Sequence, residues 1–245
     1  MELSHTEKFK LQKKLVNDTM NPVFLANVAA PRLGNAVAQL IELWKVKTKV
    51  ADGASFEAAK DLHRTIFDSI WGVATGEEAN AINLQRDNLD NKQSAAVKSR
   101  KILNDGQIVE FEKVSDPPIF SAVHDILCSM LGMDSSPAPR LHHWVLRHFT
   151  SLGAAFALKD KILEDRIAAS RRDPPDEQSK NSSALDWVVR RAIAHEIKIG
   201  QAVDDELIKG EMLGWVAAVS VEWSDGVVIL TLLRDMRLLL QVLAG

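Results

Sequence analysis

The sequence contains no tyrosine and only one cysteine among its 245 residues. The absence of tyrosine excludes acid catalysis by a phenol group. A single cysteine, Cys128, cannot form a disulfide within the chain, and this agrees with a reducing compartment.

The sequence also lacks a targeting segment and a strong excess of charge. Its first residues, MELSHTEKFKLQKK, contain no apolar core of a signal peptide, and no apolar run reaches membrane length. We therefore expect a cytoplasmic protein without a transmembrane anchor. The formal net charge of -3 provides no basic field for phosphates, so nucleic acid is not an expected partner.

The best-known cofactor and hydrolase motifs are missing too. The sequence contains no Gly-x-Gly-x-x-Gly, no phosphate-binding Walker loop and no Gly-x-Ser-x-Gly. Nucleotide cofactors and hydrolase triads therefore lack support.

The hydrophobic residues that are present, 46% of the chain, recur with helical spacing. After Pro31, the residues Val37, Leu40, Ile41 and Trp44 predict one buried helical stripe. Further helices are expected over 56–74, 118–134, 140–171, 183–200 and 204–241. We expect an all-α fold with one helical domain over 1–245 and at most a short strand near 106–112. The polar segment 77–100 is predicted to be a long surface connection with room for a short helix, and 172–183 is predicted to be an exposed linker.

Several blocks of sequence resemble fungal cytochromes P-450. They are KKLVNDTMNPVFLANVAAP at 13–31, PRLHHWVLRH at 139–148, KDKILEDRIAASRR at 159–172 and SALDWVVRR at 183–191. The blocks keep the family's order, and the resemblance runs from about Lys8 to about Val228. It implies the helical half of a cytochrome P-450, in which the second and third blocks roof a substrate pocket.

The family's haem-binding residues are changed or missing. The Trp-x-x-x-Arg pair that holds a haem propionate corresponds to Phe9 and Lys13. The family's Ala-Gly-x-Asp-Thr-Thr segment corresponds to 218–223, where Val219 replaces the glycine and Val221 replaces the acid. Neither a Glu-x-x-Arg element nor a cysteine loop occurs in the sequence. The resemblance therefore implies a truncated, haem-free protein with no cofactor.

Other residues that could bind a metal or act as nucleophiles have simpler explanations. Cys128 lies on a predicted helix, where we expect a buried and inert thiol. The histidines 142, 143 and 148 are not spaced to converge on one metal ion, so packing is favoured over metal binding. The pair His195-Glu196 is expected to be solvated. The acids 204–206 suit the start of a helix better than a metal or diphosphate site.

The last predicted helix carries the candidate catalytic residue, Glu222. Trp215, Val219, Glu222 and Gly226 share one helical face, and the resemblance places Val219 and Glu222 where the family faces its haem. A carboxylate in this apolar stretch is costly to bury unless it is paired, protonated or used in catalysis. The alternatives are a salt bridge, to Arg147 or Arg190 for example, and simple exposure.

The resemblance places a hydrophobic substrate pocket between the roof helices and the last helix. The residues assigned to it are Trp215, Val219, Trp223, His124, His143 and Trp144. We predict a haem-free cyclase or isomerase acting on a hydrophobic terpenoid or polyketide-like intermediate of secondary metabolism. The alternative is a non-catalytic protein that binds a small molecule or serves as an auxiliary partner. Either protein would expose apolar surface, so we expect a homo-oligomer.

Overall fold

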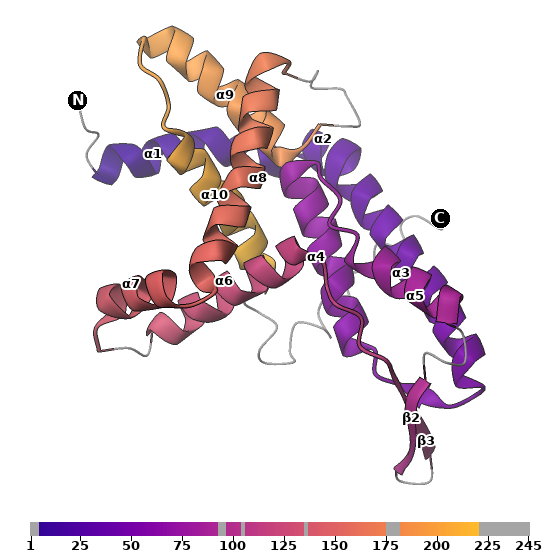
Figure 1. Ribbon diagram of the computed structural model, residues 1–245. Helices are drawn as coiled ribbons and strands as arrows, with labels where there is room; N and C mark the ends of the chain where they lie inside the picture. Colours follow the sequence, from indigo (N-terminus) through magenta and orange to yellow (C-terminus); the bar gives the residue numbers. More distant parts are fainter. Residues whose placement is uncertain (1–4, 93–96, 104–105, 135–136, 175–181, 221–245) are drawn as a thin grey trace.

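The computed structural model describes residues 5–92, 97–103, 106–134, 137–174 and 182–220 (Figure 1). Helices form most of the described chain, as predicted. The N-terminal helical elements are α1 (His5–Val16), a 3-10 turn (Asn17–Met20), α2 (Pro22–Phe24), a π-helical segment (Leu25–Ala29), α3 (Ala30–Ala51), α4 (Ala59–Thr75) and α5 (Ala81–Lys92). The remaining helices are α6 (Pro118–Asp134), α7 (Pro139–Phe149), α8 (Leu152–Arg172), α9 (Ala184–Ile199) and α10 (Asp205–Ser220).

Helix α4 is the central element of the fold. It packs against α3 and α5 on one side and against α9 and α10 on another (Figure 1). Its buried hydroxyl groups bond back to its own backbone, as where Thr65 and Ser69 donate to carbonyls one turn earlier, at 2.8 and 2.7 Å. Polar side chains can therefore lie inside this helix without unpaired donors.

Helix α3 begins near Pro31, as predicted, but its buried stripe is rotated from the predicted one. The buried residues are Ala36, Leu40, Leu43, Lys47 and Ala51, whereas Ile41 is 47% exposed. The prediction was right for Leu40 and wrong for Ile41. The small residues Ala36 and Ala51 and the stem of Lys47 complete the buried face. A pattern of large hydrophobic residues does not reveal such a face.

The strand predicted near 106–112 is present as β3 (Gly106–Phe111) and belongs to a small sheet with two further strands. These are β1 (Ser55–Phe56) and β2 (Val97–Leu103), and the strand order is β1-β3-β2. β2 runs antiparallel to β3, with Arg100 opposite Val109, while β1 pairs with β3 in parallel. The predicted connection over 77–100 contains α5, which agrees with the short helix allowed there, and the start of β2, which was not predicted. The signal for β2 was weak because the strand is mostly polar.

The predicted linker 172–183 is buried at its end. Ser182 and Ser183 are fully buried, while residues 175–181 lie outside the described part of the chain. The Ser183 side chain caps α9 by accepting a bond from the Asp186 backbone at 3.2 Å, and the Asp186 carboxylate accepts from the Ser183 backbone at 2.8 Å. Trp187 donates its indole N–H to the Ser182 hydroxyl at 3.2 Å. These bonds draw the segment into the core.

The predicted helical run 140–171 consists of two helices, α7 and α8. The chain is extended at Thr150, and α8 begins at Leu152. A side chain at Gly153 would collide with the carbonyl oxygen of Arg147, so glycine permits the close approach of the two helices.

Helix α10 confirms the start of the last predicted helix. It begins at Asp205 and is described to Ser220, and the rest of the predicted segment to 241 lies outside the described residues. Trp215 of α10 packs against three hydrophobic clusters, which connects this helix with α2, α4 and α9. None of the helices described here is both long and apolar enough to cross a membrane.

Candidate functional site at the interface of α4, α6 and α10

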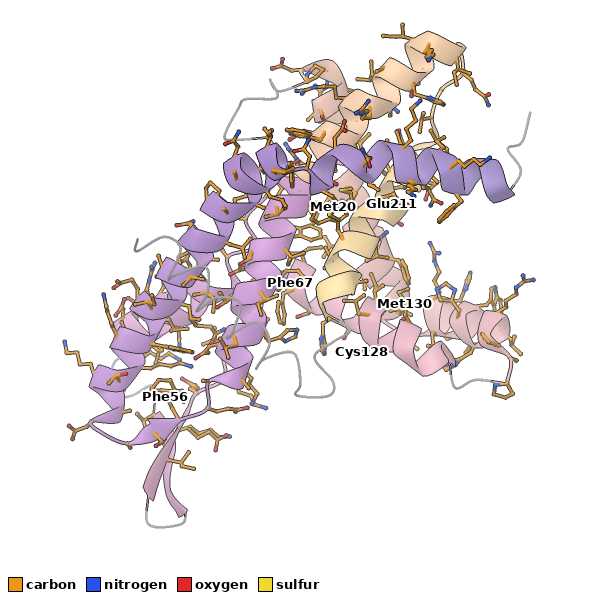
Figure 2. The ribbon with its side chains drawn as sticks, turned by 180° about the vertical axis from the view of Figure 1, so that it is seen from behind. Met20, Phe56, Phe67, Cys128, Met130 and Glu211 are labelled. Atoms are coloured by element: carbon orange, nitrogen blue, oxygen red, sulfur yellow. The ribbon has the colours of Figure 1, made fainter. Side chains whose placement is uncertain are left out.

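An aromatic cluster lies where α4 and α6 meet, with α10 packed against it. Each of the two helices contributes three residues spaced four apart, which lie on one helical face. They are His63, Phe67 and Trp71 of α4, and Phe120, His124 and Cys128 of α6. Figure 2 shows Phe67 inside the helical body and Cys128 at its edge. We call these six residues the aromatic cluster.

The inner part of the aromatic cluster is apolar and closely packed. The Phe67 and Trp71 rings are stacked with their centroids 5.9 Å apart, and Phe120 meets Phe67 edge-on at 4.9 Å. Val216 of α10 is buried against them, and Trp215 covers the neighbouring side. These rings are part of the hydrophobic core and form a rigid apolar wall beside the two histidines of the cluster.

Two histidines lie at the outer end of the aromatic cluster. The His63 ring contacts Phe120 at 5.2 Å and His124 at 5.7 Å between centroids. Burial lowers the pKa of His63 below its ordinary value of 6.5, and the positive charges of His124 and Arg64 lower it further, whereas Asp116 opposes the shift. His63 is therefore neutral near pH 7 and can accept a proton.

Cys128 is exposed, so the prediction of a buried thiol was wrong. The core-facing residues of α6 are Val123, Ile126 and Leu127, and this stripe leaves position 128 at the edge beside His124. The Cys128 Sγ lies 3.6 Å from the His124 Nε2, within reach of a sulfur hydrogen bond. A thiol beside an imidazole can exchange protons or act as a nucleophile. The spacing of four residues between His124 and Cys128 was visible in the sequence and was overlooked.

The residues assigned to the pocket from the sequence lie in two separate places. Trp215 and His124 both border the hydrophobic core around Phe120. His143 and Trp144 lie instead on α7, where His143 packs against Phe156 at 5.6 Å and Trp144 is 50% exposed. Leu146 of α7 packs against Ala122 and Ile126 of α6. The described ring contacts of His143 and Trp144 are instead with Phe156, His148 and Phe149.

The predicted catalytic residue Glu222 lies outside the described residues, as does Trp223, and the side chain of Val219 is not described either. Its two suggested partners are described. Arg147 is exposed and lies over the Phe156 ring at 4.8 Å, and Arg190 is partly buried on α9. The assignment of Glu222 as an acid or base stays a prediction.

The described histidines and acids do not gather into a metal site. Within the described ranges, no three His, Cys, Asp or Glu side chains lie where they could hold one ion. His148 bonds to the Trp144 carbonyl at 2.8 Å, as expected for packing. At the start of α10, Asp205 accepts a bond from Arg171 at 2.8 Å, and Asp204 accepts from the Glu206 backbone at 3.0 Å.

The sequence predicted that Glu196 is solvated, but its carboxylate is partly buried and paired. Its carboxylate accepts bonds from Arg171 at 3.1 Å and from the Val203 backbone at 2.9 Å. Burial alone would raise the pKa of Glu196, but these hydrogen bonds outweigh it and lower the pKa. The connection between α9 and α10 folds back over the carboxylate, which the sequence pattern did not indicate.

The residues in the described part of the chain do not fit a haem. Cys128, the one cysteine of the sequence, lies on a helix against His124 and not in a loop of backbone donors. Phe9 is 62% exposed and has no donor for a propionate, and Lys13 is an exposed cation without that partner. No step of the chemistry considered below uses a haem.

Comparison with curated proteins identifies distant relatives over most of the chain. It is 22% identical to a cytochrome P-450 monooxygenase of Fusarium sporotrichioides over 85% of its length. Monooxygenases of the same kind from Pestalotiopsis microspora and Penicillium rubens are 25% and 26% identical over 89% and 94% of the chain. The match spans 37%, 38% and 40% of these three relatives, respectively. No family model and no solved structure matches. The chain is a distant homologue of fungal cytochrome P-450 monooxygenases.

Proposed function

We propose that this protein is a haem-independent cyclase or isomerase of secondary metabolism that acts on a hydrophobic terpenoid or polyketide-like intermediate. The observation that carries the proposal is the neutral His63 at the outer end of an apolar aromatic surface. Rearrangement of such a substrate needs a shaped apolar surface and a group that moves a proton. It needs neither an oxidant nor a reductant, because the atoms of the product equal those of the substrate.

The two ends of the aromatic cluster support different parts of this chemistry. Phe67, Trp71 and Phe120 would hold the apolar body of the substrate and restrict its conformations. The neutral imidazole of His63 would take a proton from carbon, and the same proton would return at another carbon. The positive charge of Arg64 disfavours a charged imidazole at His63, so the protonated ring would readily give up the proton. The proton must therefore return quickly.

The test uses purified protein and an extract from a strain that lacks this gene. The parent protein should consume one metabolite and form a product of the same mass. Because general acid-base catalysis contributes about a hundredfold or more, His63→Gln should lose about that factor in turnover. His148→Gln on α7 is the matched control and should keep full activity.

The variant Glu222→Gln tests whether Glu222, and not His63, is the group that moves the proton. If the carboxylate is the acid or base, its loss should lower turnover by about a hundredfold without changing the melting temperature. If Glu222→Gln is fully active and His63→Gln is inactive, the histidine carries the proton transfer. Full activity of both variants would contradict proton chemistry at either residue.

A second candidate function is a non-catalytic auxiliary protein that binds a small molecule or a partner. It is favoured by the exposed apolar side chains of α7, which include Leu141 at 61%, Trp144 at 50% and Phe149 at 72% exposure. Apolar residues grouped on one exposed helix are typical of interaction surfaces. Retention of a metabolite by the protein without turnover would support this function over catalysis.

A further inference from the structure

A pocket lies on a different face of α4 from the aromatic cluster. It has a volume of about 280 Å³ and opens where α3, α4 and α5 meet β3. The side chains that matter for its chemistry are Lys47, Asp61, Gln85, Leu89, Phe111 and Lys113. Figure 2 shows Phe56, which lies beside this pocket, at the sheet end of the molecule and well apart from Cys128.

The buried charges of the pocket neutralise each other. Lys47 donates to both carboxylate oxygens of Asp61, at 2.8 and 2.6 Å, and the Trp44 indole donates to one of them at 3.0 Å. The Lys47 ammonium also faces the rings of Phe56 and Phe111, 5.6 and 5.2 Å from their centroids. This arrangement fixes the rear wall and leaves Asp61 unavailable for a cationic ligand.

The side-chain amide of Gln85 has a hydrogen-bond donor that a ligand could satisfy. Its side chain is 8% exposed, and its Nε2 is buried and has no hydrogen-bond partner among the described residues, although Gln85 belongs to the pocket lining. A buried donor without an acceptor is unfavourable and rare in native proteins. An oxygen atom of a bound molecule would satisfy it.

The charges around the pocket favour an anion. Its acidic residues are all paired with lysines: Glu57 with Lys60 at 3.0 Å, Glu110 with Lys98 at 3.5 Å, and Glu112 with Lys92 at 2.6 Å. Arg64 is paired with Asp116 at 2.6 Å. Of the cations that line the pocket, Lys113 alone has no ion pair within the described residues. After these ion pairs are counted, the Lys113 ammonium is the one positive charge of the described lining that is left to face a ligand.

The remaining wall is apolar. Leu89 and Val109 are buried, and Phe111 packs edge-on against Phe56 with 6.0 Å between centroids. A pocket of this volume lies near the lower limit for small-molecule sites. We propose that it binds a small organic carboxylate with an apolar body, whose carboxylate accepts from Gln85 and faces Lys113. This proposal does not depend on the proposed rearrangement chemistry.

The test measures the binding of sodium phenylacetate to the full chain by titration calorimetry. The parent protein should bind phenylacetate at least about tenfold more tightly than phenylacetamide, which has the same shape without the charge. Gln85→Leu should weaken binding by about tenfold or more, because the donor is lost. Its melting temperature without ligand should stay the same or rise.

Two further variants keep the result decisive. Gln39→Leu makes the same substitution outside this pocket and should bind phenylacetate like the parent. Lys113→Gln should weaken binding by several-fold and reduce its dependence on salt. The proposal is overturned if phenylacetate gives no binding heat with the parent protein, if phenylacetamide binds equally well, or if Gln85→Leu binds unchanged. If Gln85→Leu does not fold, unchanged binding by Lys113→Gln overturns it instead.

Discussion

At the scale of single residues, His63 lies where a positive charge is unfavourable. Burial and the neighbouring cations lower its pKa, so the native protein keeps this imidazole neutral. The unfolded chain takes up the proton once the pH falls below the ordinary value of 6.5. The stability that neutral His63 contributes is therefore present above that value and is lost as the pH falls through the lowered native pKa.

We expect the free energy of unfolding to decrease from about pH 7 to about pH 5, and His63→Gln to make this decrease smaller. Denaturant melts at the two pH values measure the difference between the variants. His148→Gln, at an exposed position of α7, is the control and should leave the pH dependence unchanged. An equal decrease in His63→Gln and in the parent would show that the native pKa is not lowered.

At the scale of elements, α9 depends on the reciprocal cap formed by Ser183 and Asp186. Ser183→Ala removes the hydroxyl that accepts from the Asp186 backbone, so it should lower the free energy of unfolding by about 1 to 2 kcal/mol. Urea melts provide the measurement. Ser151→Ala is the matched control, because Ser151 precedes α8 and its side chain makes no capping bond. A similar loss of stability in both variants would contradict the role of the cap.

The sequence predicted those elements whose signals are local. The prolines before α6 and the serine before α9 indicate where these helices begin, and a regular apolar stripe marks the core face of α6. It did not predict β2, because a mostly polar strand is held by pairing with β3 and not by its own pattern. The buried Ser182 depends on distant groups as well, since Arg32 donates to its carbonyl at 3.1 Å.

The candidate site was predictable only in part. Trp215 and His124 were assigned correctly to elements, but their common neighbour Phe120 and the contribution of His63 depend on how α4 packs against α6. His143 and Trp144 were assigned through the resemblance, and the break at Thr150 instead directs them to α8 and to their own helix. Periodicity gives a residue's helical face, whereas the contact between two helices also depends on the connections between them.

At the scale of the whole molecule, we predict self-association, because α7 exposes an apolar face. Sedimentation at micromolar concentrations should show a dimer or larger oligomer in equilibrium with the monomer. The double variant Trp144→Ser with Phe149→Ser should shift this equilibrium to the monomer, because the apolar contact is lost. Ile197→Ser removes an isolated residue that is 82% exposed on α9 and should have no effect. A parent protein that stays monomeric would contradict the prediction.

We expect this distant homologue of cytochrome P-450 monooxygenases to bind no haem. The most direct measurement is the absorption spectrum of the full chain after expression with added haem precursor and purification. We predict no Soret band, and no shift when carbon monoxide is added to the reduced protein. The described residues offer neither a thiolate in a donor-rich loop nor the Trp-Arg pair that holds a haem propionate. A strong Soret band that shifts with carbon monoxide would contradict the account.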